Sequence, residues 1–251
     1  MTLQHISCKI VVMIKRTPLI NYQERVLKIL SGRIKNFYLA GGTALSRFYF
    51  QHRDSDDLDF FTQNFLPLRV EKIKETIARG LQKKIELIAE QTKEGKAKMM
   101  VYNVSLTKKQ VLRIDFVEDY LNLIRPLNIV NGIPIISLRD IYIRKIYAIV
   151  GFVVEKDAIG RKIITGRQEA KDFYDLFFLS QTYIPLSDFA FRYCDQVRQE
   201  GLIRWFRTYN RLAIKSGLLD LKTKKKPDCQ NIERHFKKEI DELIGKKVNF
   251  I

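Results

Sequence analysis

A short apolar strand that runs into two glycines and then into a helix restricts the fold of this 251-residue chain more than any other feature. Residues 37–40 have the apolar character of the strand, and residues 43–50 that of the helix, with Thr43 as its candidate N-cap. Between them, Gly41 and Gly42 allow backbone N–H groups to approach a ligand closely, at the positive end of a helix dipole. The junction therefore predicts an α/β layer with a candidate triphosphate site where the strand ends, and an ordinary turn explains the two glycines as well.

The strand that follows carries two carboxylates among apolar side chains. Asp57 and Asp59 are two residues apart, so both project from the same face of a strand. Neighbouring like charges beside apolar residues such as Phe60 repel each other and lose solvation unless a cation lies between them. Carboxylate oxygens are the ligands that Mg²⁺ prefers, usually one or two of them together with substrate phosphates. The pair therefore predicts a site for Mg²⁺, with Mn²⁺ as an alternative.

A third carboxylate is available on a later strand. Residues 99–106 and 111–117 have the length and β-branched content of an antiparallel hairpin, and Asp115 is the only carboxylate within the second of them. If that strand pairs beside residues 57–61, Asp115 joins the two earlier aspartates around two Mg²⁺ ions. Two-metal sites of this kind activate an attacking oxygen and stabilise the leaving group of an in-line displacement.

The remaining pattern divides the chain into an α/β first half and a helical second half. In the first half, we expect helices over residues 19–35 and 67–84 and a further strand over 85–89. Turn residues lie at 131–134, and the helices expected after them cover residues 137–150, 167–180, 186–200, 202–216 and 230–244. The expected fold class is α+β: a small mixed sheet flanked by helices in residues 1–130, followed by a mainly helical part in residues 131–251.

The charge balance narrows the choice of partners. Lys and Arg number 45 against 28 Asp and Glu, a formal net charge of +17, and residues 201–251 alone hold 13 against 6. Such an excess favours a polyanion, so this basic tail is a candidate RNA contact through counterion release. Its densest run, Lys222 to Lys226, we interpret as an exposed linker. A solvated basic surface, or a docking site for an acidic protein, explains the same charge.

Several classes of protein are excluded. The three cysteines lie far apart in the chain, so they form no disulfide framework and suit a reducing compartment. No segment approaches the roughly 20 apolar residues of a membrane span, so we expect no membrane partner and a cytoplasmic location. No Walker loop or zinc-ligand pattern is present. We interpret residues 1–12 as an extension that precedes the natural start at Met13.

These motifs, in this order, resemble those of the AbiEii/AbiGii toxin nucleotidyltransferases, a branch of the superfamily typified by DNA polymerase β. The resemblance rests on four segments: Leu39-Ala40-Gly41-Gly42-Thr43-Ala44-Leu45; His52-Arg53-x-Ser55-x-Asp57-Leu58-Asp59-Phe60; a lysine-bearing helix at residues 137–145; and Arg167-Gln168-Glu169-Ala170-Lys171-Asp172-Phe173-Tyr174-Asp175-Leu176. Four segments in the family's order make the resemblance far more specific than a lone glycine-rich loop.

For the glycine junction and the acidic strands, the resemblance implies a nucleotide and metal site. Gly41, Gly42 and Thr43 would line the triphosphate, and Ser55 would lie beside the metal ions. The two aspartates of the first acidic strand would bind the metal. Asp115 would be a third metal ligand, at an acid position that varies in this family.

For the helical half, the resemblance implies that Lys145 neutralises phosphate charge. Asp172 would be a distal essential acid that orients Lys145 or the acceptor. Lys145 lies on a helix face that should pack, where a lone amine needs a partner. Asp172 and Asp175 share a helix face, and pairing with nearby cations explains either of them without a functional role. Arg53 either contacts phosphate or pairs with a neighbouring aspartate.

The resemblance as a whole implies an Mg²⁺-dependent nucleotidyltransferase toxin, with Asp57, Asp59, Lys145 and Asp172 as its catalytic residues. Family members move a nucleotide from an NTP to an acceptor, with tRNA 3′ ends the best-supported class, so we expect translation to be blocked. The expected partners are an NTP, an RNA such as tRNA, and a cognate antitoxin. The alternatives are transfer to a protein or a small molecule, and a non-catalytic protein that only binds nucleotide, RNA or a partner.

Overall fold

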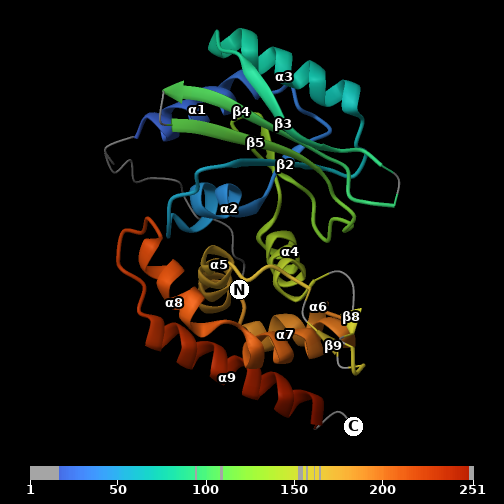
Figure 1. Cartoon of the computed structure of the whole chain (residues 1–251), viewed down its shortest axis with the longest axis vertical. Helices are drawn as coiled ribbons and strands as arrows, with labels where there is room; N and C mark the ends of the chain where they lie inside the picture. Colours follow the sequence, from blue (N-terminus) through green and yellow to red (C-terminus); the bar gives the residue numbers. More distant parts are fainter. Residues whose placement is uncertain are drawn as a thin grey trace, which may run out of the picture.

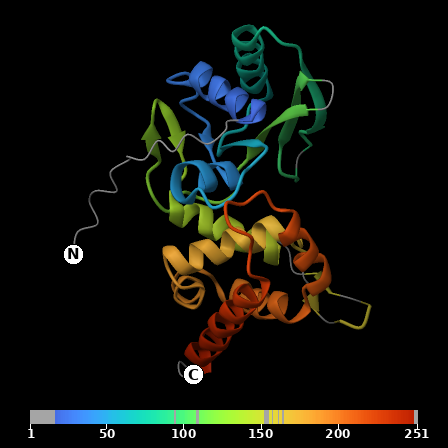
Figure 2. The same cartoon turned by 90° about the vertical axis from the view of Figure 1, so that its left-hand side faces the viewer.

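The computed structural model describes residues 17–248, apart from residues 94, 108–109, 152–154, 157, 161 and 164. Figure 1 shows a sheet with helices above it and a group of helices below it, and Figure 2 shows the same arrangement from the side. The expected fold class is confirmed, because a mixed sheet with helices occupies the N-terminal part and the C-terminal part is mainly helical. The extension expected at residues 1–12 lies outside the described residues.

Within the described residues, seven strands form one sheet, in the order β3-β4-β5-β2-β1-β7-β6. The strands are β1 (Tyr38–Leu39), β2 (Leu58–Thr62), β3 (Ile85–Gln91), β4 (Met99–Thr107), β5 (Gln110–Glu118), β6 (Asn128–Val130) and β7 (Ile133–Ile135). β2 is parallel to β5 and β1 is parallel to β7, whereas the other neighbours are antiparallel. The hairpin expected from residues 99–106 and 111–117 is confirmed as β4 and β5.

Two helices cover one face of this sheet (Figure 1): α1 (Pro18–Leu30) and α3 (Pro67–Leu81). Beneath them, the Phe116 ring packs against Phe37 with centroids 5.5 Å apart and against Phe60 with centroids 5.6 Å apart. Side chains alternate along a strand, so Asp59 and Asp115, the neighbours of Phe60 and Phe116, point to the opposite face. The core on one face thereby fixes the direction of the carboxylates on the other.

The first helix is shorter than the sequence predicts. The apolar period predicts a helix over residues 19–35, but α1 ends at Leu30. The chain then turns at Gly32, whose φ of +70° suits glycine, and the Gly32 N–H donates to the carbonyl of Gly132 at 2.8 Å. Ile34, which continues the helical pattern in the sequence, is buried after this turn instead.

The helix after the two glycines begins earlier than predicted. α2 (Gly41–Ala44) starts at the first glycine and continues as a π-helix, η1 (Leu45–Phe50). Ala40 therefore holds the N-cap position, and the prediction of a Thr43 cap is wrong. The reason is a tertiary contact, because the Thr43 hydroxyl donates to the backbone carbonyl of Asp57. This hydrogen bond ties the helix to the start of the acidic strand.

The described part of the helical half contains six helices and a short hairpin. These are α4 (Leu138–Val150), α5 (Ala170–Thr182), α6 (Leu186–Tyr193), α7 (Gln196–Thr208), α8 (Arg211–Asp220), α9 (Cys229–Val248), and the strands β8 (Glu155–Lys156) and β9 (Lys162–Ile163). The helices predicted at residues 186–200 and 202–216 have the wrong boundaries. Asp195 and Asn210 interrupt them, because each side chain accepts a hydrogen bond from the backbone N–H three residues later and caps a new helix.

Aromatic side chains form the core of the helical half. The rings of Phe173, Trp205 and Phe236 meet with centroids 4.6, 5.3 and 5.5 Å apart, and all three are buried. The helices arrange their apolar faces around this core. None of the helices in the described ranges is both long enough and apolar enough to cross a bilayer.

The sheet and the helical half adjoin at β7. Leu39 of β1 lies opposite Ile135 of β7, and α4 begins three residues after this strand. The sheet therefore takes in residues 133–135, which the sequence division at residue 130 assigns to the helical half. The two-domain division itself stays a prediction.

Candidate active site

A cavity of about 400 Å³ is lined by residues of both halves of the molecule. Its walls come from the glycine junction, the segment before β2, β5, α4, the segment before α5, and the end of α8. The cavity is lined by eight of the predicted site residues: Gly41, Gly42, Arg53, Ser55, Asp57, Asp59, Asp115 and Lys145. The other two, Thr43 and Asp172, are buried and do not line it.

The three predicted carboxylates come together because β2 pairs in parallel with β5. Asp59 lies directly opposite Asp115 in this register, and Asp57 immediately precedes β2. All three line the same cavity. The expectation that the strand of Asp115 pairs beside residues 57–61 is therefore confirmed.

The carboxylates repel one another in a partly buried space. Burial, together with the carboxylates of Asp115 and Asp57, raises the pKa of Asp59 to about 6. Burial also raises the pKa of Asp57, although the nearby Lys171 opposes the effect. A divalent cation relieves this repulsion, and carboxylate oxygens are the ligands that Mg²⁺ prefers. The donor chemistry of Asp57 and Asp59 therefore fits Mg²⁺.

Asp115 is held by an arginine that sequence reasoning missed. Arg113 Nε and Nη2 lie 2.7 and 2.8 Å from the two carboxylate oxygens of Asp115, so both oxygens are engaged. The two residues are two apart on β5 and therefore share a face, a spacing that the sequence already contains. Among the described residues, no group of three or more His, Cys, Asp or Glu side chains is arranged to hold a metal ion. Asp57 and Asp59 are thus the carboxylates that this arrangement leaves open to a cation.

The two glycines are required by the site's own side chains. Gly41 has a φ of +63°, and a Cβ there would lie 2.1 Å from Asp59 Oδ2. A Cβ on Gly42 would lie 2.4 Å from Arg53 Nη2 and 3.2 Å from Ser55 Oγ. The junction therefore packs directly against the acidic strand and the segment before it, and a Cβ at either glycine would force these side chains to move. Contact between these glycines and phosphates stays a prediction.

Thr43 and Ser55 occupy different positions. Thr43 is 1% exposed, and its hydroxyl donates a hydrogen bond to the carbonyl of Asp57. Thr43 therefore stabilises the start of the acidic strand without facing the cavity. Ser55 lines the cavity, and its carbonyl accepts a hydrogen bond from the Gln23 side-chain amide of α1 at 2.8 Å. Of the two hydroxyl residues, only Ser55 is placed to touch a molecule in the cavity.

Lys145 lines the cavity from α4 and is buried between two carboxylates of α5. Its Nζ lies 2.6 Å from Asp172 Oδ1 and 2.7 Å from Asp175 Oδ2. Burial alone would lower the pKa of Lys145, but attraction by Asp175 and Asp172 outweighs burial and raises it. The ammonium group therefore stays charged, and the partner that a buried amine needs is this pair of aspartates.

Asp175 links the segment before β2 to the helical half. Its carboxylate accepts hydrogen bonds from Arg53 Nε at 2.6 Å and Nη2 at 2.7 Å, and it lies 2.8 Å from His52 Nε2. Burial would raise the pKa of Asp175, but Lys145, Arg53 and the hydrogen bond with His52 hold it well below its usual range. Arg53 is thus paired with the carboxylate of Asp175, and it contacts the neighbouring Asp54 through the backbone carbonyl of that residue, at 2.9 Å.

Asp172 is shared by two cations. Besides Lys145, it binds Arg167, whose Nε lies 2.5 Å from Asp172 Oδ2. Burial would raise the pKa of Asp172, but Lys145 and Arg167 outweigh it and lower the pKa. The Arg167 side chain is 49% exposed and lines the cavity, whereas Asp172 is fully buried. Asp172 therefore orients two cationic groups that face the cavity.

The end of α8 and the start of the predicted exposed linker form part of the cavity wall. Asp220, Leu221 and Lys222 line the cavity, and the Lys222 carbonyl accepts a hydrogen bond from the N–H of Asp54 at 2.8 Å. The segment is exposed, as predicted, but its backbone is hydrogen-bonded to the segment before β2, which we also call the approach to β2. No local signal could predict this contact, because Lys222 and its ion-pair partner Asp56 are 166 residues apart.

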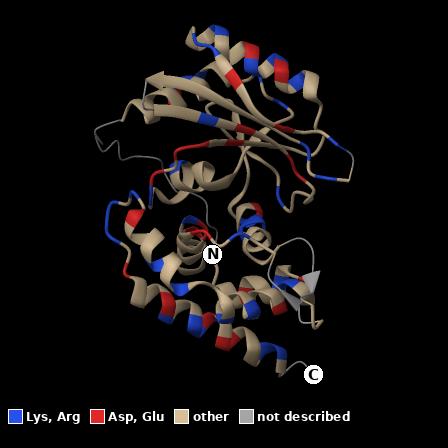
Figure 3. Cartoon of the chain, viewed as in Figure 1, with Lys and Arg blue, Asp and Glu red and all other residues tan. Residues whose placement is uncertain are grey.

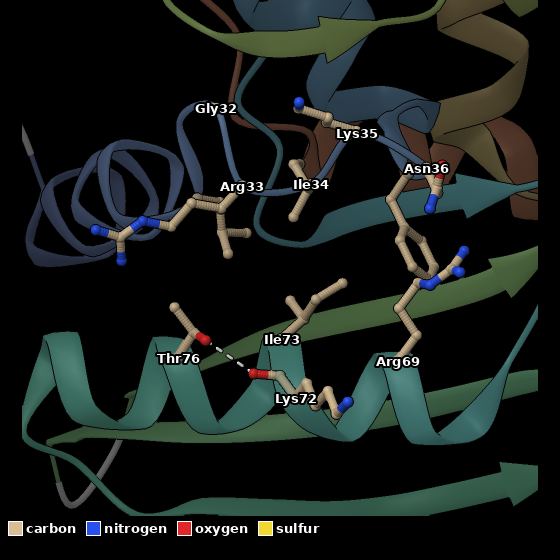
Figure 4. Close-up of a pocket in the computed structure, with 11 residues that line it drawn as sticks. Gly32, Arg33, Ile34, Lys35, Asn36, Arg69, Lys72, Ile73 and Thr76 are labelled. Carbon is tan, nitrogen blue, oxygen red and sulfur yellow. Dashed lines mark hydrogen bonds between the residues drawn. The ribbon is translucent and has the colours of Figure 1, made fainter.

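A second cavity, of about 380 Å³, has different chemistry (Figure 4). It lies between the turn after α1 and the helix α3. Its polar lining residues are cationic or neutral: Arg33, Lys35, Asn36, Arg69, Lys72 and Thr76. No carboxylate lines it, so it has no counterpart of the acidic strands. The cavity with the three aspartates is therefore the candidate active site.

Comparison with known proteins gives a family match and similar solved structures, two of which are crystal structures from Helicobacter pylori. A family model described as "Nucleotidyl transferase AbiEii toxin, Type IV TA system" matches residues 25–246. JHP933 from Helicobacter pylori is 17% identical with a TM-score of 0.56, over 95% of this chain and 97% of that one. A "putative nucleotidyltransferase" from H. pylori is 16% identical with a TM-score of 0.56, over 93% of this chain and 98% of that one. No curated protein matches the chain.

The two crystal structures share the fold of this chain. The family match covers the glycine junction, both acidic strands and the two motifs of the helical half. The chain therefore belongs to the AbiEii nucleotidyltransferase toxin family of type IV toxin–antitoxin systems.

Proposed function

We propose that this protein transfers a nucleotide from an NTP to a hydroxyl group of an RNA, with a tRNA 3′ end as the leading acceptor. One observation carries the proposal: Lys145 of α4 lines the same cavity as Asp57 and Asp59, which come from a distant segment of the chain. The cavity thus offers negative groups for a divalent cation beside positive groups for phosphates. Such a transfer would block the tRNA in translation, and the family adds a cognate antitoxin as the partner that restrains it.

In the proposed reaction, the acceptor hydroxyl oxygen attacks the α-phosphorus of the NTP. A new phosphorus–oxygen bond forms while the bond from the α-phosphorus to the bridging oxygen of the β-phosphate breaks, and pyrophosphate leaves. The hydroxyl proton passes to a carboxylate of the acidic strands. Negative charge gathers on the α-phosphate and the leaving pyrophosphate, so positive groups fixed in advance near these oxygens contribute most to the rate.

The acidic strands and the lysine have separate roles. Asp57 and Asp59 hold Mg²⁺ or Mn²⁺, and the bound ion supplies positive charge for the α-phosphate and the leaving group. Lys145 donates hydrogen bonds to phosphate oxygens from a position that its partners fix in advance. Asp172 acts through Lys145 and Arg167, so it is a positioning residue. Asp115 joins the ligands only if its pair with an arginine opens.

The glycine junction forms the wall for the triphosphate. Gly41 and Gly42 bring the backbone close to the acidic strand, and Ser55 adds a hydroxyl on the same wall. Arg53 places its guanidinium beside Gly42, where it adds positive charge for phosphates while Asp175 holds it. Thr43 contributes by holding the junction against the strand.

The test is incubation of the native chain and of Asp57→Asn with each labelled NTP, Mg²⁺ and total tRNA. The expected result is label on RNA with the native chain and a loss on the order of 100-fold or more with the variant. Asp241→Asn, on the exposed surface of α9, is the matched control and transfers label as the native chain does. A native chain that labels no RNA overturns the acceptor, and label that persists in Asp57→Asn overturns the metal assignment. The same reactions, analysed for labelled protein and small molecules, detect the alternative acceptors.

A further inference from the structure

The loop between α8 and α9 contains a basic segment, residues 222–226, that we call the basic strap. Its backbone is fixed at the edge of the active-site cavity. The Lys222 carbonyl accepts a hydrogen bond from the N–H of Asp54 at 2.8 Å, and Thr223 forms an antiparallel bridge with Arg53. Figure 1 shows this orange-red segment rising from the helical half towards the approach to β2. The start of the strap backbone is therefore held beside the cavity.

The charges of the strap are only partly neutralised. Lys222 Nζ lies 3.2 Å from Asp56 Oδ2, and Lys224 Nζ lies 3.5 Å from Gln51 Oε1, which is a neutral amide oxygen. Figure 3 shows the basic strap beside the acidic segment that leads into β2. Lys224, Lys225 and Lys226 are exposed, and in the described part of the chain no carboxylate lies within ion-pair distance of them. These three lysines are available to an external anion.

The other cations of the cavity are already paired. Lys145 and Arg53 bind the buried carboxylate of Asp175, and Arg113 binds Asp115. Their positions are fixed by these contacts, which suits a small ligand held in one geometry. The strap lysines are instead point charges on flexible stems, which suit a chain of phosphates with no single required geometry.

The length of the strap also fits a chain of phosphates. Three consecutive residues in a loop span about 7–10 Å. In a stacked helical strand the rise along the axis is about 3.4 Å per nucleotide, so this length corresponds to about two to three nucleotides of a stacked strand. If the reacting end of an RNA lies in the cavity beside Lys222, the next phosphates of that RNA lie next to the strap.

We propose that the basic strap binds the phosphate backbone of the acceptor RNA next to its reacting end. This inference rests on the proposed function, because it takes RNA as the acceptor. Lys224, Lys225 and Lys226 supply affinity for the RNA strand, whereas binding of the NTP depends on the groups inside the cavity.

The experiment compares three triple variants with the native chain. Lys224→Gln/Lys225→Gln/Lys226→Gln removes the three charges of the strap. Lys224→Arg/Lys225→Arg/Lys226→Arg keeps the charges and reports whether the strap tolerates substitution. A matched control, Arg33→Gln/Lys35→Gln/Lys72→Gln, removes three exposed charges around the second cavity (Figure 4). For each protein, thermal unfolding checks the fold, and binding of total tRNA is measured over a series of salt concentrations.

The expected result is a loss of tRNA affinity of roughly 100-fold at about 0.1 M salt for the glutamine variant of the strap. The slope of log affinity against log salt also falls by about 2, because about three phosphate contacts are lost. The arginine variant and the control stay within about threefold of the native chain, since arginine keeps the charges and the control charges surround a different cavity. Equal losses in the strap variant and the control overturn the proposal. Native affinity in the strap variant overturns it too, as it would if an acidic protein were the partner.

Two further measurements separate this proposal from the proposed function. Binding of non-hydrolysable NTP analogues is expected to be unchanged in the strap variant, because the strap does not serve the triphosphate. A tenfold or greater loss of analogue binding overturns that assignment. If the native chain transfers no label to tRNA yet binds it through the strap, the proposed reaction fails while the RNA contact stands. If it transfers label and the strap variant transfers equally well at limiting tRNA, the strap proposal fails while the reaction stands.

Discussion

Lys145 keeps its charge inside the protein because two carboxylates face it, and Asp175 keeps its own because Lys145, Arg53 and His52 surround it. Removing one charged residue from such a buried cluster should greatly lower the free energy of unfolding. The remaining charges stay buried without their partner, and that penalty exceeds what the intact pairs contribute to stability. The residues that make the cavity charged are therefore also residues that hold the two halves together.

Asp175→Asn should lower the free energy of unfolding by about 3–5 kcal/mol, because Arg53 and Lys145 lose a buried carboxylate. Urea unfolding at neutral pH measures this difference. Asp188→Asn is the control: its carboxylate pairs with Lys246 at a partly exposed position, and its loss should change stability by about 1 kcal/mol or less. A change in Asp175→Asn no larger than that of the control would contradict the structural role of the cluster.

Gly41→Ala should abolish transfer and lower the free energy of unfolding by about 2–4 kcal/mol. The left-handed backbone alone accounts for about 1–2 kcal/mol. The added Cβ would also lie 2.1 Å from Asp59 Oδ2 and force the carboxylate to move. Gly32→Ala separates the two effects, because Gly32 has a φ of +70° but no atom within 4 Å of its Cβ position. If both variants lose the same stability and keep activity, the close approach of Gly41 to Asp59 has no consequence.

Arg113→Gln should bind Mn²⁺ more tightly than the native chain does, by on the order of tenfold, which corresponds to about 1.4 kcal/mol. The substitution removes a positive charge beside the acidic strands and releases both oxygens of Asp115. Isothermal titration with Mn²⁺ in the absence of NTP measures the affinity. Arg33→Gln, at the second cavity, serves as control. Unchanged or weaker binding in Arg113→Gln would show that Arg113 does not compete with a metal ion.

At the scale of elements, strands and helices with clear periodicity were predictable, and the residues that end them were not. The hairpin of β4 and β5 follows from two β-branched runs with a polar turn, which are short-range signals. The end of α1 depends on Gly132, far along the chain, so the apolar period predicted too long a helix. At Asp195 and Asn210 the apolar pattern continues across the break, and only the capping side chains show it.

In the candidate site, too, patterns within a short stretch of sequence were predictive, whereas contacts between distant segments were not. Asp57, Asp59 and Asp115 were predictable, because a lone carboxylate in an apolar strand stands out and strand pairing fixes its direction. The pair of Arg113 with Asp115 was visible at a spacing of two residues but was overlooked. The contact of the basic strap with the approach to β2 joins segments 166 residues apart, so no periodicity or local composition reports it.

Asp195→Ala should lower the free energy of unfolding by about 1 kcal/mol, because the Asp195 carboxylate accepts the hydrogen bond of the Arg198 N–H at 2.9 Å and begins α7. Denaturant unfolding measures the loss. Asp241→Ala, which removes only an exposed pair with Lys237 on α9, should lose no more than about 0.5 kcal/mol. Equal losses in the two variants would mean that the cap does not fix the start of α7.

At the scale of the whole molecule, ionised groups join the sheet to the helical half. Arg53 belongs to the segment before β2, while Asp175 and Lys145 belong to α5 and α4. The connection depends on the charge of Asp175, so the stability of the molecule depends on pH through this carboxylate. Apolar packing between the halves carries no such dependence.

The stability difference between the native chain and Asp175→Asn should be largest above about pH 5 and should shrink on acidification. The folded state holds the pKa of Asp175 well below the usual value of about 3.9, so the unfolded state binds more protons at low pH. Stability from this group is therefore complete above the unfolded pKa and is lost as the pH falls through the folded pKa. Urea unfolding of both proteins from neutral pH to about pH 3 tests this. A difference that stays constant with pH would contradict it.

Asp220, Leu221 and Lys222 form part of the cavity wall, and they are synthesised after the other residues that line it. A ribosome synthesises the acidic strands, Lys145 and Asp175 well before it reaches residue 220. Until these wall residues emerge, the growing chain has its carboxylates and its glycine junction but lacks this part of the cavity wall. The site of this toxin therefore gains its full wall only after the ribosome has passed residue 222.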